Sequence, residues 1–215
     1  MTDNSQYLIL SSYDDVYAKV GLGPLSAAKN KEYADKHGYS FQCKNEQLKS
    51  HYFFHKFMLL SEVLPNYSHV LWIDADAFLV NHSKKIQNFI PDDPEKIFTV
   101  SIDQEYLNTG VFIIKNCDLS MELLKKVVEI GSQINHPFPD AFVLLKMFEQ
   151  QPQYVNYIKP QKLFNAYKYE LYAHRMQPNP DGEFEQGVSY VLHFPGMSLQ
   201  DRVNAYHKYN VKEMV

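Results

Sequence analysis

The run from Val70 to Val80 constrains the fold more than any other stretch of the chain. Four apolar residues lead into Asp74 and Asp76, and apolar residues resume directly after them. A run so rich in apolar, β-branched and aromatic residues is typical of a strand buried on both faces. Ligands of α/β sheets bind at the carboxyl ends of such strands, and unpaired buried carboxylates are costly. Two interpretations are open: the two aspartates hold a divalent cation, or they cap the next helix and pair with Lys or Arg.

The bulk composition fits one soluble domain that spans residues 1–215. Hydrophobic residues make up 45% and charged residues 21%, which excludes a disordered chain. The net charge is -4 with scattered Lys and Arg, so we expect no nucleic-acid partner. The first six residues lack the layout of a signal peptide, and no apolar run approaches the roughly 20 residues of a membrane span. We therefore expect a cytoplasmic protein with no membrane span.

Apolar periodicity, Gly and Pro divide the chain into alternating strands and helices. Strands are predicted over 7–10, 39–43, 69–73, 97–102, 111–114 and 188–192. Helices are predicted over 25–37, 51–64, 84–90, 118–130 and 141–150. The segment 159–187 shows little periodicity, and a loop of that length is usually functional or a lid. The pattern predicts the α/β class.

Several polar groups flank these elements, and each has a structural alternative. Ser11-Ser12-Tyr13 follows the first strand, where it would hold a nucleotide or form a turn that caps a helix. Lys56 could reach a phosphate from its helix. Asn108-Thr109-Gly110 either lets a ligand approach the backbone closely or forms a tight turn. Asp140 stands where a helix N-cap is expected, so capping is its default role.

The order of these motifs resembles GT-A glycosyltransferases, and more narrowly the family of yeast Golgi galactosyl- and mannosyltransferases and plant xyloglucan xylosyltransferases. The matching segments are 71–77, with the Asp-x-Asp pair, 107–116, 164–167 and the His-Phe-Pro-Gly run at 193–196. Members usually carry Asp-Gln where this chain has Asp140-Ala141, and they are typically anchored in the Golgi membrane. A small version without an anchor looks like the glycosyltransferase domains of large algal viruses such as chlorella viruses, which glycosylate their own capsid protein.

The resemblance implies a single GT-A domain with a mixed, mostly parallel central sheet flanked by helices. About 1–80 would form the nucleotide-binding half, and about 97–210 the acceptor and metal half. The donor would be a nucleoside diphosphate sugar, with UDP as the expected nucleotide, and the acceptor a hydroxyl of a glycan or glycoprotein. Mn²⁺, or Mg²⁺ as a weaker fit, would neutralise the leaving diphosphate.

The resemblance also implies roles for individual residues. Asp76 and His193 would bind the metal, and Asp74 would share the metal or hold the ribose. Asp140 would take the proton of the acceptor hydroxyl, if the transfer inverts configuration. The remaining contacts to the nucleotide sugar would come from Ser11, Ser12, Tyr13, Lys56, Ala75, Asn108, Gly196 and Arg202.

Two other classes remain as alternatives. A phosphohydrolase of the haloacid dehalogenase type also places Asp-x-Asp after an apolar strand and uses the first Asp as nucleophile. That type usually carries the motif near its N-terminus, whereas here the pair begins at Asp74. The other alternative is a protein that binds a sugar nucleotide or glycan without turnover.

Overall fold

A six-stranded sheet with the strand order β2-β1-β3-β6-β5-β7 forms the centre of the fold. The computed structural model describes residues 4–45, 52–104, 107–131, 133–151, 154, 156–174 and 176–215. Its strands are β1 (Tyr7–Tyr13), β2 (Ser40–Asn45), β3 (His69–Ile73), β5 (Phe98–Ile102), β6 (Leu107–Lys115) and β7 (Asn156–Lys159). Strand β6 runs antiparallel to both of its neighbours, and the other pairs are parallel. The predicted mixed, mostly parallel sheet is confirmed.

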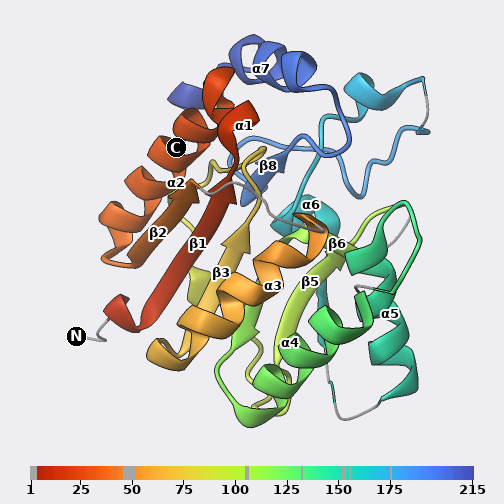
Figure 1. The fold of residues 1–215 in the computed structure, drawn as a ribbon. Coiled ribbons are helices and arrows are strands. Elements are labelled where there is room, and N and C mark those ends of the chain that lie inside the picture. Colours follow the sequence, from red (N-terminus) through yellow and green to blue (C-terminus); the bar gives the residue numbers. More distant parts are fainter. Residues whose placement is uncertain are drawn as a thin grey trace.

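Helices cover both faces of this sheet, as Figure 1 shows. The α-helices are α1 (Asp15–Lys19), α2 (Leu22–His37), α3 (Tyr52–Val63), α4 (Asp118–Gly131), α5 (Pro139–Gln150), α6 (Gln161–Phe164) and α7 (Leu199–Lys208). Short 3₁₀ helices lie at Asn4–Gln6, Leu64–Asn66, Ile86–Phe89, Tyr169–Tyr172 and Val211–Glu213. None of the helices in the described part of the chain is long and apolar enough to cross a membrane.

Strand β3 shows how the apolar run builds two cores at once. Val70 and Trp72 pack into a cluster with side chains of α3, α4 and α5. Leu71 and Ile73 point to the opposite face and pack with α2, α6 and the residues around Tyr190. Because successive side chains of a strand alternate between faces, a continuous apolar run is what a strand covered on both sides requires.

A second, two-stranded sheet places a late segment of the chain beside the residues that follow β3. Strands β4 (Ala77–Leu79) and β8 (Val191–His193) pair antiparallel, and Ala77 lies opposite His193. This pairing brings the residue after Asp76 next to a histidine far along the chain. The sequence pattern did not predict β4, β7, α1 or α7.

Several predicted boundaries are wrong, and each error has a physical cause. Strand β1 continues to Tyr13 because its polar end pairs with β2, in the register Tyr13 to Asn45. Strand β6 begins at Leu107, so Asn108-Thr109-Gly110 belongs to a strand and not to a turn. The helix predicted over 84–90 is a single 3₁₀ turn, Ile86–Phe89. The helix predicted from residue 51 is described from Tyr52, and residue 51 lies outside the described residues.

The segment predicted as one long loop over 159–187 contains packed structure. It holds α6 and the 3₁₀ turn Tyr169–Tyr172, with Tyr167 and Tyr172 fully buried. An aromatic cluster of Tyr167, Tyr169 and Tyr172 forms its core. Periodicity could not show this core, because its side chains come from irregular backbone and single turns.

Candidate active site

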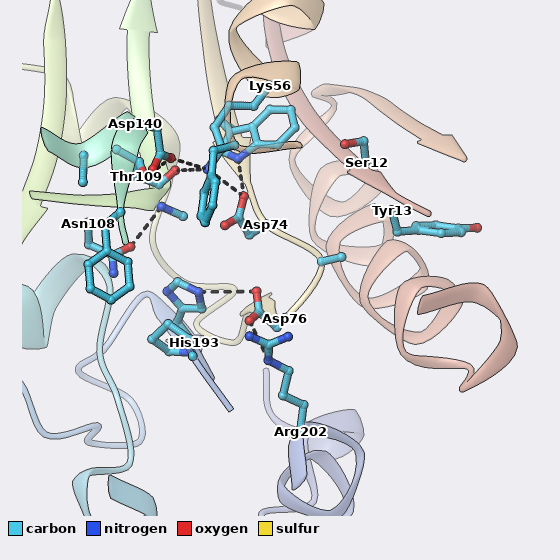
Figure 2. Close-up of a pocket in the computed structure, with 18 of the residues that line it drawn as sticks. Ser12, Tyr13, Lys56, Asp74, Asp76, Asn108, Thr109, Asp140, His193 and Arg202 are labelled. Carbon is cyan, nitrogen blue, oxygen red and sulfur yellow. Dashed lines mark hydrogen bonds and ion pairs between the residues drawn. The ribbon is translucent and has the colours of Figure 1, made fainter. Parts of the chain in front are cut away.

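A cavity of about 840 Å³ lies at the carboxyl ends of β1 and β3, where the antiparallel strand β6 begins. Figure 2 shows that Lys56 and Asp140 on one side and His193 and Arg202 on the other point towards Asp74 and Asp76. The predicted site residues that line this cavity are Ser12, Tyr13, Lys56, Asp74, Ala75, Asp76, Asn108, Asp140, His193, Gly196 and Arg202. Ser11 is different, because it is buried within β1 and does not belong to the lining.

One group of charges, which we call the His193 cluster, consists of Asp76, His193 and Arg202. The Nε2 atom of His193 lies 3.4 Å from Oδ1 of Asp76. The Nε atom of Arg202 lies 2.9 Å from Oδ2 of the same carboxylate. Burial alone would raise the pKa of Asp76, but the guanidinium of Arg202 outweighs burial and holds the pKa below its usual value. Asp76 is therefore ionised at neutral pH.

A second group, the Lys56 cluster, consists of Lys56, Asp74, Thr109 and Asp140. The ammonium of Lys56 lies 3.3 Å from Oδ1 of Asp74 and 3.3 Å from Oδ2 of Asp140. It also donates to the carbonyl of Thr109 at 3.0 Å, so three ammonium protons have three acceptors. Burial would lower the pKa of Lys56, but the two carboxylates raise it above its usual value. Lys56 is therefore charged.

Asp74 links the Lys56 cluster to the strand that precedes it. The indole Nε1 of Trp72 donates to Oδ1 of Asp74 at 2.6 Å. This contact follows from strand geometry, since residues two apart lie on the same side. Burial and the neighbouring Asp76 raise the pKa of Asp74, although Lys56 opposes them. Oδ2 of Asp74 makes no hydrogen bond to any residue that the structure describes, so it is available to a ligand.

The prediction that Asp140 caps helix α5 is wrong. The N-cap is Phe138, because Pro139 takes the first helical position that its fixed φ favours. Asp140 follows in the first turn, where its Oδ2 accepts from the hydroxyl of Thr109 at 2.6 Å. In β6 Thr109 points to Asp140, while Asn108 and Gly110 face the other side, towards Asn165 and His193.

The structure contains a donor set that fits a divalent cation. Oxygen atoms of Asp74 and Asp76 and a ring nitrogen of His193 all lie within 4.8 Å of one another. Two carboxylates and one imidazole suit Mn²⁺, and Mg²⁺ less well because it prefers oxygen ligands alone. The structure brings together the three residues that the family resemblance implied as ligands, which supports a metal site.

Four neighbours of the site were given no role of their own from the sequence, although three of them lie in the matched segments 71–77, 107–116 and 164–167. They are Trp72, Asp103, Thr109 and Asn165. Trp72 carried a signal, since its position two residues before Asp74 places it on the same side of β3. Asn165 contacts His193 from 28 residues away, a distance in sequence that no local pattern reports.

Solved structures with the same architecture are glycosyltransferases. One, involved in the glycosylation of the major capsid of PBCV-1, matches with a TM-score of 0.69 and 18% identity, over 94% of this chain and 98% of that chain. GlyE of Streptococcus pneumoniae TIGR4 matches with a TM-score of 0.58 and 12% identity, over 95% of this chain and 64% of that chain. The galactosyltransferase LgtC, solved with donor and acceptor sugar analogs, matches with a TM-score of 0.53 and 15% identity, over 94% of this chain and 95% of that chain.

These identities establish the fold alone, and the chain has the GT-A glycosyltransferase fold. The GT-A fold that the resemblance in the sequence motifs implied is thereby confirmed. No curated protein matches the sequence. A family model described as "Protein of unknown function, DUF273" matches residues 26–152, which is more than half of the chain and includes both aspartates and Asp140. The chain therefore belongs to the DUF273 family.

Proposed function

We propose that this protein is a metal-dependent glycosyltransferase. It would move a sugar from a nucleoside diphosphate sugar, with UDP as the expected nucleotide, to a hydroxyl of a glycan or glycoprotein. One observation carries the proposal: Asp74, Asp76 and His193 bring their ligand atoms within 4.8 Å of one another beside a large cavity in a GT-A fold. Cavities of this volume accept ligands the size of a nucleotide sugar.

The metal would be held by Asp76 and His193, with Asp74 sharing it or binding the ribose. A divalent cation bound there would act as a Lewis acid on the diphosphate and stabilise the charge of the leaving group. Arg202 would add positive charge beside it. Gly196 lines the same cavity with φ 63, a left-handed conformation that favours glycine and leaves the backbone open to the phosphates.

The nucleoside would lie along the end of β1, against Ser12 and Tyr13 and the backbone of Ala75. Tyr13 rests on Gly23, where an added Cβ would lie 2.4 Å from its ring. This contact fixes the ring beside the cavity. Ser11 would support the strand from within, because its side chain is buried.

The reacting end of the cavity would be formed by Asn108 and Asp140. Both polar contacts of Asp140 with described residues, to Lys56 and Thr109, are made by Oδ2. Oδ1 could therefore accept the proton of the acceptor hydroxyl, as an inverting transfer requires. Lys56 would hold the Asp140 carboxylate in place.

A thermal-shift panel tests the proposal directly. The purified protein is heated with UDP-, GDP- and other nucleoside diphosphate sugars, each with and without Mn²⁺. A true donor should raise the melting temperature only in the presence of the metal, because a ligand bound to the native state alone stabilises it. Full sugar transfer in the presence of a chelator would contradict the metal-dependent mechanism.

The role of Asp140 needs its own variant. Asp140→Asn keeps an oxygen for the hydroxyl of Thr109 but cannot serve as a base. Donor binding should stay near the wild-type value while transfer falls by about 10²–10⁴-fold. Normal transfer by this variant would remove Asp140 from the reaction.

The two alternatives are not favoured by the comparisons, whose matched structures are glycosyltransferases. Release of phosphate from a generic phosphomonoester would revive the phosphohydrolase class. Slow hydrolysis of the bound donor by the purified protein would exclude a binder without turnover.

A further inference from the structure

A chain of amide groups leads from strand β6 to the buried ring of His193. It starts at the backbone N–H of Gly110, which donates to Oδ1 of Asn108 at 3.0 Å. A backbone nitrogen can only donate, so the orientation of the Asn108 amide is fixed at this first link. Nδ2 of Asn108 then faces the carboxylate of Asp103 at 3.1 Å, which agrees with the same orientation.

The second link fixes Asn165. Its Nδ2 lies 2.8 Å from Oδ1 of Asn108, an acceptor, so this atom must be the donating nitrogen. Oδ1 of Asn165 is therefore the atom that lies 3.0 Å from Nδ1 of His193. A side-chain amide oxygen can only accept a hydrogen bond, so Nδ1 of His193 must carry a proton.

The imidazole ring is held in place by its surroundings as well. A Cβ added at Gly110 would lie 2.3 Å from Cε1 of His193, so the ring packs directly on the glycine backbone. Tyr167 packs edge-on against it, with ring centroids 5.6 Å apart. The backbone N–H of His193 also donates to the carbonyl of Ala166, the residue after Asn165, at 2.9 Å. The ring can neither flip nor withdraw without moving its neighbours.

We propose that Asn165 is a positioning residue that holds His193 in its Nδ1-protonated tautomer and thereby aims the Nε2 lone pair at Asp76. The inference rests on the proposed function, because it concerns the ligand geometry of the same metal site. In the neutral ring, Nε2 and Oδ1 of Asp76 are two acceptors that face each other across 3.4 Å. Such a pair is stable when a cation lies against both atoms, and outer hydrogen bonds of this kind tune metal ligands.

The proposal also explains the Asn-Thr-Gly motif in physical terms. The backbone N–H of Gly110 fixes the orientation of the Asn108 amide, and Asn108 in turn fixes the orientation of the Asn165 amide. Gly110 also leaves space for the imidazole ring. The Thr109 side chain lies on the opposite face of the strand, where it donates to Asp140. The motif is therefore expected to act through His193 in addition to any contact with the donor sugar.

Nitrogen NMR of the metal-free protein tests the tautomer. The protein is labelled with ¹⁵N-histidine, and His193 is assigned by comparison with His193→Ala. In neutral His193, Nδ1 should show a protonated signal and Nε2 an unprotonated one. The reverse assignment in the wild-type protein would overturn the proposal, whatever the variants do.

Mn²⁺ affinity, measured by the EPR signal of the free ion without any donor or acceptor, tests the role of Asn165. Asn165→Leu should bind Mn²⁺ about 10–100-fold more weakly than wild type. Asn165→Asp keeps an oxygen acceptor for Nδ1, so it should keep the tautomer and recover most of that loss. Asn81→Leu is the matched control, because Asn81 is also buried but bonds the carbonyl of Gly187 at 2.8 Å.

The outcomes separate this proposal from the proposed function. Unchanged Mn²⁺ affinity in Asn165→Leu, or equal losses in the Leu and Asp variants and in the control, would overturn the positioning role. No Mn²⁺ binding by the wild type would overturn both the positioning role and the metal site. Tight Mn²⁺ binding with the expected tautomer but no sugar transfer would leave the inference standing and refute the transferase.

Discussion

The two charged clusters of the cavity balance their charges in different ways. In the Lys56 cluster, one ammonium has a hydrogen-bond acceptor for each of its three protons. In the His193 cluster, Arg202 satisfies one oxygen of Asp76, while the other oxygen faces an imidazole nitrogen. The ammonium of Lys56 is saturated within the protein, whereas Oδ2 of Asp74 and Oδ1 of Asp76 have room for a cation. We infer that Lys56 contributes stability and positions Asp74, and that the His193 cluster together with Asp74 holds the metal.

Of the changes that test this difference between the clusters, removing the charge of Asp76 should have the largest effect, a loss of Mn²⁺ affinity. Asp76→Asn removes the anionic ligand and leaves Arg202 without its partner. Loss of an outer hydrogen-bond partner is expected to lower Mn²⁺ affinity about 10–100-fold. Loss of the anionic ligand itself should lower Mn²⁺ affinity further. Calorimetry with Mn²⁺ alone measures it, and Asp35→Asn on the exposed surface of α2 is the control. Unchanged affinity would move the metal away from the His193 cluster.

Breaking the Lys56 cluster should instead lower stability. Lys56→Met leaves the buried Asp140 and the half-buried Asp74 without their cation, and should cost about 3–5 kcal/mol in the free energy of unfolding. Adding Asp140→Leu removes the unpaired carboxylate and should restore part of that loss. Urea unfolding provides the measurement. A large drop in Mn²⁺ affinity of Lys56→Met, with little loss of stability, would reverse the assignment of the two clusters.

His69, which lies outside both clusters, should contribute to the loss of stability in acid. Burial, with a contribution from Lys115, lowers the pKa of His69 from 6.5 to about 4. The unfolded chain binds this proton first, so the stabilisation is complete above pH 6.5 and is lost as the pH falls towards 4. The loss should be at most about 3 kcal/mol. Urea unfolding from pH 7.5 to 4.5 should show a shallower decline for His69→Gln, and equal slopes would contradict the account.

The smallest expected effect comes from Thr109→Val. This isosteric change removes the hydrogen bond to Oδ2 of Asp140 but leaves Lys56 in place. The free energy of unfolding should fall by about 1–2 kcal/mol, and Mn²⁺ affinity should not change. A change in metal affinity would show that the two clusters are coupled through β6.

The apolar run 69–73 could be predicted as a strand to the residue, because burial on both faces leaves a strong local pattern. The convergence of Asp74, Asp76 and His193 came from resemblance to a family. The strand predicted over 188–192 overlaps β8, but its partner β4 had no signal of its own, so the pairing of the two could not be predicted. Asp140 was predicted as a cap because local sequence shows a helix start but not the Lys56 ammonium opposite. The contacts of Asn165 and Thr109 depend on tertiary packing, which local patterns do not report.

Trp72 is the single tryptophan of the chain, and its indole N–H bonds the carboxylate of Asp74 at 2.6 Å. Tryptophan fluorescence of the unlabelled protein therefore reports on one position, Trp72 at the edge of the cavity. The emission of an indole depends on the hydrogen bond that it donates and on the charges around it. Any ligand that draws Asp74 away from Trp72 should shift this emission. The protein thus carries its own optical reporter of site occupancy, and donors and metals can be titrated without a dye or a coupled assay.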